Sequence, residues 1–134
     1  MNTIYQNLII KANLKCVFEA VTSPDLLNQW WTTKSLGELA IGGIYSFWFS
    51  EEYDWQAKVI ELDINQLVGY RMIKADQDWE GTELRFKIEI ISEQTTRLHF
   101  YHIGWKEMNL HFGQTSHCWA LYLNTLKDLL ETNN

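Results

Sequence analysis

The stretch Thr82–Ile90, T-E-L-R-F-K-I-E-I, alternates polar and apolar side chains without a break from Glu83 onward. Successive residues of a strand point to opposite faces of a sheet, so the apolar residues here share one face and the charged residues share the other. The apolar set is Leu84, Phe86, Ile88 and Ile90. This alternation is typical of an antiparallel sheet with one face on the core and one face in water.

Segments on either side of this strand are expected to complete the sheet. The first ten residues alternate loosely, and a turn at Gly42-Gly43 precedes the β-rich run I-Y-S-F-W-F. Residues 54–62 and 67–73 follow as further strands. After the turn at 92–96, residues 97–104 place Leu98, Phe100 and His102 on one side. The chain between about 35 and 104 therefore consists of antiparallel strands.

Three helices are expected outside that run. Asn13 can cap a helix over about 14–22, and Ser23 can cap a second helix that begins at Pro24 and ends near Trp31. The third helix, about 113–131, carries an apolar stripe made of Trp119, Leu123, Leu126 and Leu130, widened by Tyr122 and Leu129. At roughly 27 Å it is long enough to lie across a sheet. The order of elements predicts an α+β fold in which a curved sheet of about six or seven strands wraps around the C-terminal helix.

Composition limits the possible partners and the location. The chain of 134 residues is expected to form a single domain over 1–134. Its net charge is −6 and it has no basic run, which disfavours a nucleic-acid or anionic-membrane partner. No stretch approaches the length of a membrane span, and the N-terminus lacks the features of a signal peptide. Together with two cysteines that have no metal-type spacing, this predicts a cytoplasmic protein.

The sequence contains no recognisable catalytic motif. It has no G-x-S-x-G and no glycine-rich phosphate loop. His102, His117 and Cys118 could in principle meet, but a metal site needs several converging ligands, so neither a metal nor a cofactor is expected. Cys118 is expected to be a small core residue, and His102 a buried, hydrogen-bonded anchor. We therefore assign no catalytic residue and favour a binding domain over an enzyme.

Several segments in order resemble the START-like, or helix-grip (SRPBCC), superfamily, and within it the group related to the activator of the heat-shock-protein ATPase. The resemblance rests on F-E-A-V-T-S-P-D-L-L-N-Q-W-W (18–31), on Gly42-Gly43 with Tyr45, and on K-V-I-E-L-D (58–63). It continues in L-V-G-Y (67–70), in R-L-H-F-Y-H-I-G-W (97–105), and in Trp119 with the helix that follows. It implies a helix-grip fold and a cavity between the sheet and the C-terminal helix.

The unusual number of aromatic residues suggests what the cavity holds. The chain has seven Trp, six Tyr and six Phe. Each ring could equally pack in a core, but together with a few polar tips they favour a pocket for a flat or apolar molecule. In the implied fold, the residues expected to surround the cavity are Trp30, Trp48, Trp55, Tyr70, Trp79, Phe86, Ile88, Phe100, His102, Trp119, Tyr122 and Leu123. Trp31 is expected at the rim as a gate, or else as a cover for the end of the sheet.

The leading functional hypothesis is therefore the binding of a small hydrophobic or aromatic ligand. The resemblance supplies an alternative, a protein-interaction domain with a chaperone as partner. A third hypothesis is a cyclase, dehydratase or hydrolase that uses His102 or Tyr122 as an acid–base group. The sequence is compatible with a monomer or a homodimer.

Overall fold

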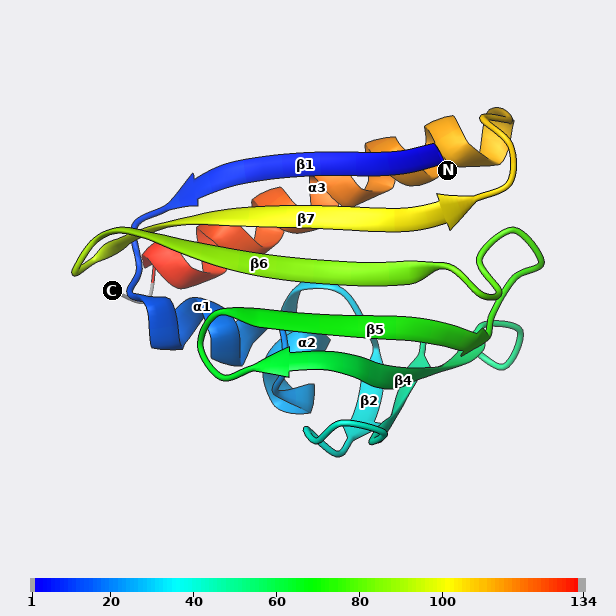
Figure 1. Cartoon of the computed structure of the whole chain (residues 1–134), viewed down its shortest axis with the longest axis horizontal. Coiled ribbons are helices and arrows are strands. Elements are labelled where there is room, and N and C mark those ends of the chain that lie inside the picture. The colour runs from blue at the N-terminus through cyan, green and yellow to red at the C-terminus, as the bar shows by residue number, and fades with distance from the viewer. Residues whose placement is uncertain (1, 133–134) are drawn as a thin grey trace.

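The computed structural model describes residues 2–132, and its centre is a seven-stranded antiparallel sheet (Figure 1). The strands are β1 (Asn2–Ile10), β2 (Lys34–Gly37), β3 (Ile44–Trp48), β4 (Asp54–Asp63), β5 (Leu67–Lys74), β6 (Glu83–Ser92) and β7 (Thr95–Trp105). Their order across the sheet is β1-β7-β6-β5-β4-β3-β2. The sequence predicted strands from about residue 35 onward, but it did not predict the short edge strand β2 as an element of its own.

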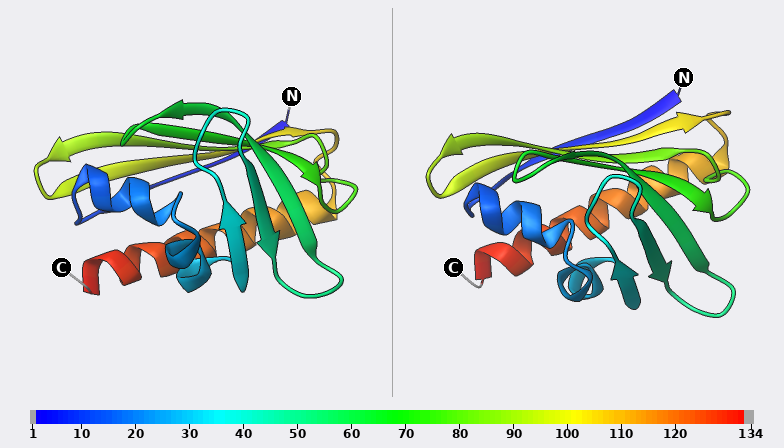
Figure 2. Two further views of the ribbon diagram at one scale, coloured as in Figure 1. Left: turned by 90° about the horizontal axis from the view of Figure 1, so that it is seen from below. Right: turned by 60° about the horizontal axis from the view of Figure 1, so that its bottom comes forward.

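Three helices lie on one face of the sheet, and the sheet curves around the longest of them (Figure 2). They are α1 (Leu14–Ala20), α2 (Pro24–Trp30) and α3 (Leu110–Thr132). The two short helices follow β1 and pack beside the C-terminal half of α3. This arrangement confirms the predicted α+β helix-grip fold. Within residues 2–132, no helix is long and apolar enough to cross a membrane.

The alternation in β6 sets the inner and outer faces of the sheet. Leu84, Phe86 and Ile88 are buried against the helices, as predicted. Ile90 was expected to join them but is 62% exposed. The β6–β7 hairpin extends beyond the helices at this end, and its pairing register shifts between Ile90 and Ser92 (Figure 1). Ile90 therefore keeps its place in the alternation but has no layer to pack against.

The ends of the helices follow local capping. The Asn13 side chain accepts a hydrogen bond from the Cys16 amide at 2.9 Å, as predicted. Ser23 occupies the cap position of α2, but its side chain makes no capping hydrogen bond. Helix α3 begins at Leu110 rather than 113, because the Asn109 side chain accepts a hydrogen bond from the Phe112 amide at 2.9 Å. This extra turn brings His111 onto the helix.

Three buried aromatic donors fasten the turn between α1 and α2 to the core. The Trp30 indole donates to the carbonyl of Ala20 at 2.8 Å. The hydroxyls of Tyr70 and Tyr45 donate to the next two carbonyls, those of Val21 and Thr22, at 2.8 and 2.7 Å. Burial raises the pKa of Tyr70 well above its usual value, so its hydroxyl stays neutral and keeps its proton. The orphan carbonyls at the end of α1 are satisfied in this way.

Candidate functional site

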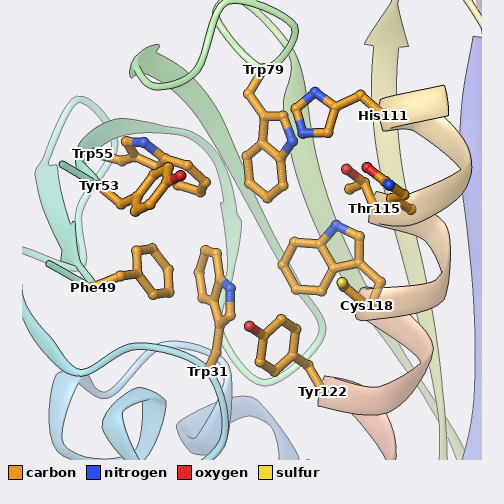
Figure 3. Close-up of a pocket in the computed structure, with 11 residues that line it drawn as sticks. Trp31, Phe49, Tyr53, Trp55, Trp79, His111, Thr115, Cys118 and Tyr122 are labelled. Carbon is orange, nitrogen blue, oxygen red and sulfur yellow. The ribbon is translucent and has the colours of Figure 1, made fainter. Parts of the chain in front are cut away.

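A pocket of about 350 Å³ lies between the N-terminal half of α3 and the part of the sheet formed by the start of β4 and the turn that joins it to β3 (Figure 3). The loop after β5 and the end of α2 complete its wall. Seven of the lining side chains are aromatic: Trp31, Phe49, Tyr53, Trp55, Trp79, Trp119 and Tyr122. The others are His111, Gln114, Thr115 and Cys118, all on α3.

The helical wall of the pocket follows from residue spacing. His111, Thr115, Cys118 and Tyr122 are separated by four, three and four residues, so they share one face of α3. Tyr122 and Cys118 are exposed at the pocket, whereas Thr115 is buried. Figure 3 shows these side chains along the helix, opposite the aromatic rings of β4 and the β3–β4 turn. Helix α3 therefore supplies most of the polar atoms, and the sheet side supplies rings.

Three tryptophans form the inner wall, with Trp119 in contact with the other two. The ring of Trp119 lies 5.1 Å from that of Trp31 and 5.9 Å from that of Trp79, between centroids. Trp119 is 1% exposed, and it also packs on Phe100 at 4.3 Å. Contacts of this kind between rings stabilise a fixed arrangement. The inner wall is thus continuous with the hydrophobic core.

His102 supports this wall from behind. Its Nδ1 accepts a hydrogen bond from the Trp119 indole at 3.2 Å, so its Nε2 carries the proton and donates to the Thr82 hydroxyl at 2.8 Å. That hydroxyl donates in turn to the carbonyl of Trp79. Burial lowers the pKa of His102 to about 3. The imidazole is therefore neutral near pH 7 and positions two tryptophans of the pocket.

One end of the pocket is polar. Asp78, in the loop after β5, accepts a hydrogen bond from Nδ1 of His111 at 2.9 Å. This hydrogen bond lowers the pKa of the Asp78 carboxyl below its usual value, so Asp78 is ionised near pH 7. The indole nitrogen of Trp79 is buried beside this end and has no hydrogen-bond partner within residues 2–132. Figure 3 shows His111, Trp79 and Thr115 grouped there.

Five of the predicted site residues line this pocket: Trp31, Trp55, Trp79, Trp119 and Tyr122. Trp31 is 7% exposed and packs against Phe49 at 5.6 Å, so it forms a wall between the β3–β4 turn and Trp119. Seven others are buried in the core and do not line it: Trp30, Tyr70, Phe86, Ile88, Phe100, His102 and Leu123. Trp48 does not line the pocket either. It follows the inward residue Phe47 on β3, so it points to the outer face of the sheet, where the Lys34 ammonium lies 5.1 Å from the centre of its ring.

Six lining residues were not among the predicted ones: Phe49, Tyr53, His111, Gln114, Thr115 and Cys118. Cys118 was expected in the core but is exposed at the pocket. The helical spacing from His111 to Tyr122 was a usable signal, but it is recognisable only when the helix is known to begin before His111. Phe49 could also have been predicted from the sequence, because it continues the alternation of Tyr45 and Phe47.

The fold occurs in several solved structures. The Aha1 dimer of Colwellia psychrerythraea is 31% identical with a TM-score of 0.87, over 98% of this chain and 97% of that chain. The protein MLL2253 of Mesorhizobium loti is 17% identical with a TM-score of 0.86, over 99% of both chains. CalU16 of Micromonospora echinospora is 16% identical with a TM-score of 0.76, over 92% of this chain and 73% of that chain. No curated protein matches the sequence.

The family assignment rests on nearly the whole sequence. The model of the family described as Activator of Hsp90 ATPase homolog 1-like protein matches residues 11–131. The matched segment begins just after β1 and includes α1, α2, the other six strands and all but the last residue of α3. The chain belongs to the family of Activator of Hsp90 ATPase homolog 1-like proteins.

Proposed function

We propose that the protein binds a small hydrophobic or aromatic molecule in the pocket between α3 and the sheet. The observation that carries this proposal is a cavity of about 350 Å³ among seven aromatic side chains. Side chains that served only as core would close such a space, because protein interiors are packed densely. An apolar lining with a few polar groups at one end is typical of small-molecule sites.

The expected affinity is modest. A flat apolar molecule that loses about 250 Å² of exposed surface gains roughly 6 kcal/mol at 25 cal/mol/Å². The loss of translational and rotational freedom on association offsets part of this gain. We therefore expect a dissociation constant in the micromolar range or weaker for a simple aromatic probe, and tighter binding for a ligand that also uses the polar end.

Replacement of Cys118 by tryptophan is expected to block the pocket. Cys118 is exposed on the pocket face of α3, so the larger ring can enter the cavity without disturbing the core. We expect at least roughly a tenfold loss of affinity for 2-methylnaphthalene, because the new ring would occupy the space that the probe needs. The measurement is a titration followed by the fluorescence of the probe.

Leu121→Trp is the matched control. Leu121 is on the same helix, is 55% exposed and does not line the pocket. This variant should bind 2-methylnaphthalene as the unaltered protein does. Equal affinities for the unaltered protein and the Cys118→Trp variant would show that the probe binds elsewhere.

The natural ligand can be sought by native mass spectrometry of protein freshly purified from its own cells. An extra mass that disappears on denaturation, and that is absent from the Cys118→Trp variant prepared in the same way, would support the proposal. An extra mass that is retained equally by the variant would place that molecule outside the pocket.

A second candidate is a protein-interaction role with a chaperone as partner. The family match and the Colwellia psychrerythraea Aha1 structure favour it. The test is capture of the ATPase chaperone of the Hsp90 class by the immobilised protein at low salt, with the Cys118→Trp variant as comparison. Capture by both proteins would support an interaction surface independent of the pocket. Failure of purified chaperone to bind at all would exclude this role.

We also infer that the chain can pair with a second copy. The support is the dimeric state of the Colwellia psychrerythraea relative, which matches nearly the whole of this chain. Both edge strands carry exposed apolar residues, Tyr5 and Ile9 on β1 and Leu36 on β2. Light scattering across a concentration series measures the mass directly, and a constant monomer mass would contradict this inference.

A further inference from the structure

We propose that the ligand carries a hydroxyl group on its apolar framework, and that Thr115 and His111 hold this hydroxyl at the polar end of the pocket. This inference rests on the proposed function, since it specifies the chemistry of the molecule that the pocket takes. It concerns a phenol or another aromatic alcohol, as distinct from a hydrocarbon, ether or ketone of the same size.

His111 supplies an oriented acceptor. An ionised carboxylate can only accept hydrogen bonds, so the 2.9 Å contact with Asp78 places the proton of a neutral imidazole on Nδ1. The lone pair of that ring is then on Nε2, the nitrogen away from Asp78. Figure 3 shows the ring of His111 at the polar end of the pocket, next to Trp79. A ligand O–H group in this place can donate to Nε2.

Thr115 supplies a donor one helical turn further along. Its side chain lines the pocket, the residue is only 5% exposed, and its hydroxyl forms no hydrogen bond with any group in residues 2–132. Its oxygen is accessible from the pocket, so a ligand there can pair with it. The hydroxyl can donate to a ligand oxygen. Thr115 lies four residues after His111 on the same face of α3, so both can reach one ligand atom.

The pair together selects for a hydroxyl. The His111 acceptor needs a donor from the ligand, whereas the Thr115 hydroxyl can donate to an acceptor on it. A hydroxyl does both with a single oxygen, but an ether or ketone only accepts and a hydrocarbon does neither. The Trp79 N–H beside the same end also has no partner within residues 2–132, but it is closed off from the pocket surface and offers no acceptor. The need for an oxygen that also donates therefore falls on His111.

The experiment compares three naphthalene probes that differ only in the substituent at position 2: 2-naphthol, 2-methoxynaphthalene and 2-methylnaphthalene. For each protein, the measured quantity is the ratio of two probe affinities, so that differences in probe hydrophobicity cancel between variants. Thr115→Val keeps the side-chain shape and removes the hydroxyl. It is expected to lower the naphthol-to-methylnaphthalene ratio roughly 3- to 10-fold, the range for one hydrogen bond. His111→Phe should lower the naphthol-to-methoxynaphthalene ratio by a similar factor.

Thr125→Val is the matched control. Thr125 is also on α3, but its hydroxyl donates to the carbonyl of Leu121 at 3.1 Å and does not line the pocket. This variant should leave both ratios unchanged. Unfolding midpoints of all variants, measured in urea, show whether each remains folded under the binding conditions.

The outcomes separate this inference from the proposed function. If 2-methylnaphthalene binds and Cys118→Trp prevents it, the pocket is a binding site. If Thr115→Val and His111→Phe then leave both ratios unchanged, the hydroxyl inference is overturned and the apolar site stands. If none of the three probes binds, the proposed function fails and this inference fails with it. A drop in both ratios with an unchanged Thr125→Val control supports the inference.

Discussion

Replacement of Trp119 by alanine is expected to lower the free energy of unfolding by about 3–5 kcal/mol, the range for removal of a large aromatic side chain from a core. Trp119 is 1% exposed and packs on Trp31, Trp79 and Phe100. Its loss leaves a cavity at the junction of α3 and the sheet, and it leaves Nδ1 of His102 without a donor. Urea unfolding followed by circular dichroism measures the change.

Two further variants separate the loss of packing at Trp119 from the loss of its indole N–H and from changes elsewhere on the helix. Trp119→Phe keeps most of the packing but removes the indole N–H, so it should cost about 1–3 kcal/mol, the penalty of an unpaired buried acceptor. Leu121→Ala alters an exposed residue on the same helix and should change the free energy of unfolding by about 0.5 kcal/mol or less. Equal destabilisation by Trp119→Ala and Leu121→Ala would show that Trp119 does not link helix and sheet.

Acidification from pH 6.5 to about pH 5 is expected to lower the free energy of unfolding by about 2 kcal/mol through His102, at about 1.4 kcal/mol per pH unit. The folded-state pKa of His102 is lowered from 6.5 to about 3. In this pH range the unfolded chain therefore binds a proton that the folded chain does not. The contribution of the neutral His102 to the free energy of unfolding is complete well above pH 6.5 and is lost as the pH drops toward 3. Urea unfolding at several pH values measures the slope.

His102→Gln provides the control for this pH dependence. A glutamine amide can still donate to the Thr82 hydroxyl, but it does not titrate. The variant should be less stable at pH 7.5 and should show a shallower loss of stability between pH 6.5 and 5. The carboxyls of Asp78, Glu89 and Glu131 also have lowered pKa values, but their contributions are lost below about pH 4.5. Identical slopes in the two proteins would contradict a neutral, buried His102.

Much of the fold could be predicted from the sequence because the apolar residues of each element recur at the spacing of a strand or of a helix. The alternation in β6 and the four- and three-residue spacing of Trp119, Leu123 and Leu126 each define a buried face. Periodicity gives the face of a residue but not the extent of the layer that covers it. For this reason Ile90, at the tip of a hairpin, was placed in the core although it is exposed.

The pocket was harder to predict, since its position depends on where the elements stop. Tyr53 lines it because the β3–β4 turn folds toward α3, and loop geometry has no periodic signal. Phe86 and Phe100 have the same inward direction but lie under α1, α2 and the middle of α3, where side chains fill the space. The start of α3 at Leu110 also decides that His111 belongs to the site.

The three consecutive carbonyls held by Trp30, Tyr45 and Tyr70 have a consequence for ligand size. Helix α2 carries Trp31 at its end. The hydrogen bonds of Tyr45 and Tyr70 tie the turn before α2 to the sheet, and that of Trp30 ties the end of α2 to the end of α1. Widening of the pocket on this side would break several buried hydrogen bonds at once, which is costly. The adjoining wall is the turn of Phe49 and Tyr53, where Tyr53 is 44% exposed. Molecules of different bulk would thus be accommodated by displacement of that turn, with α2 acting as a fixed reference.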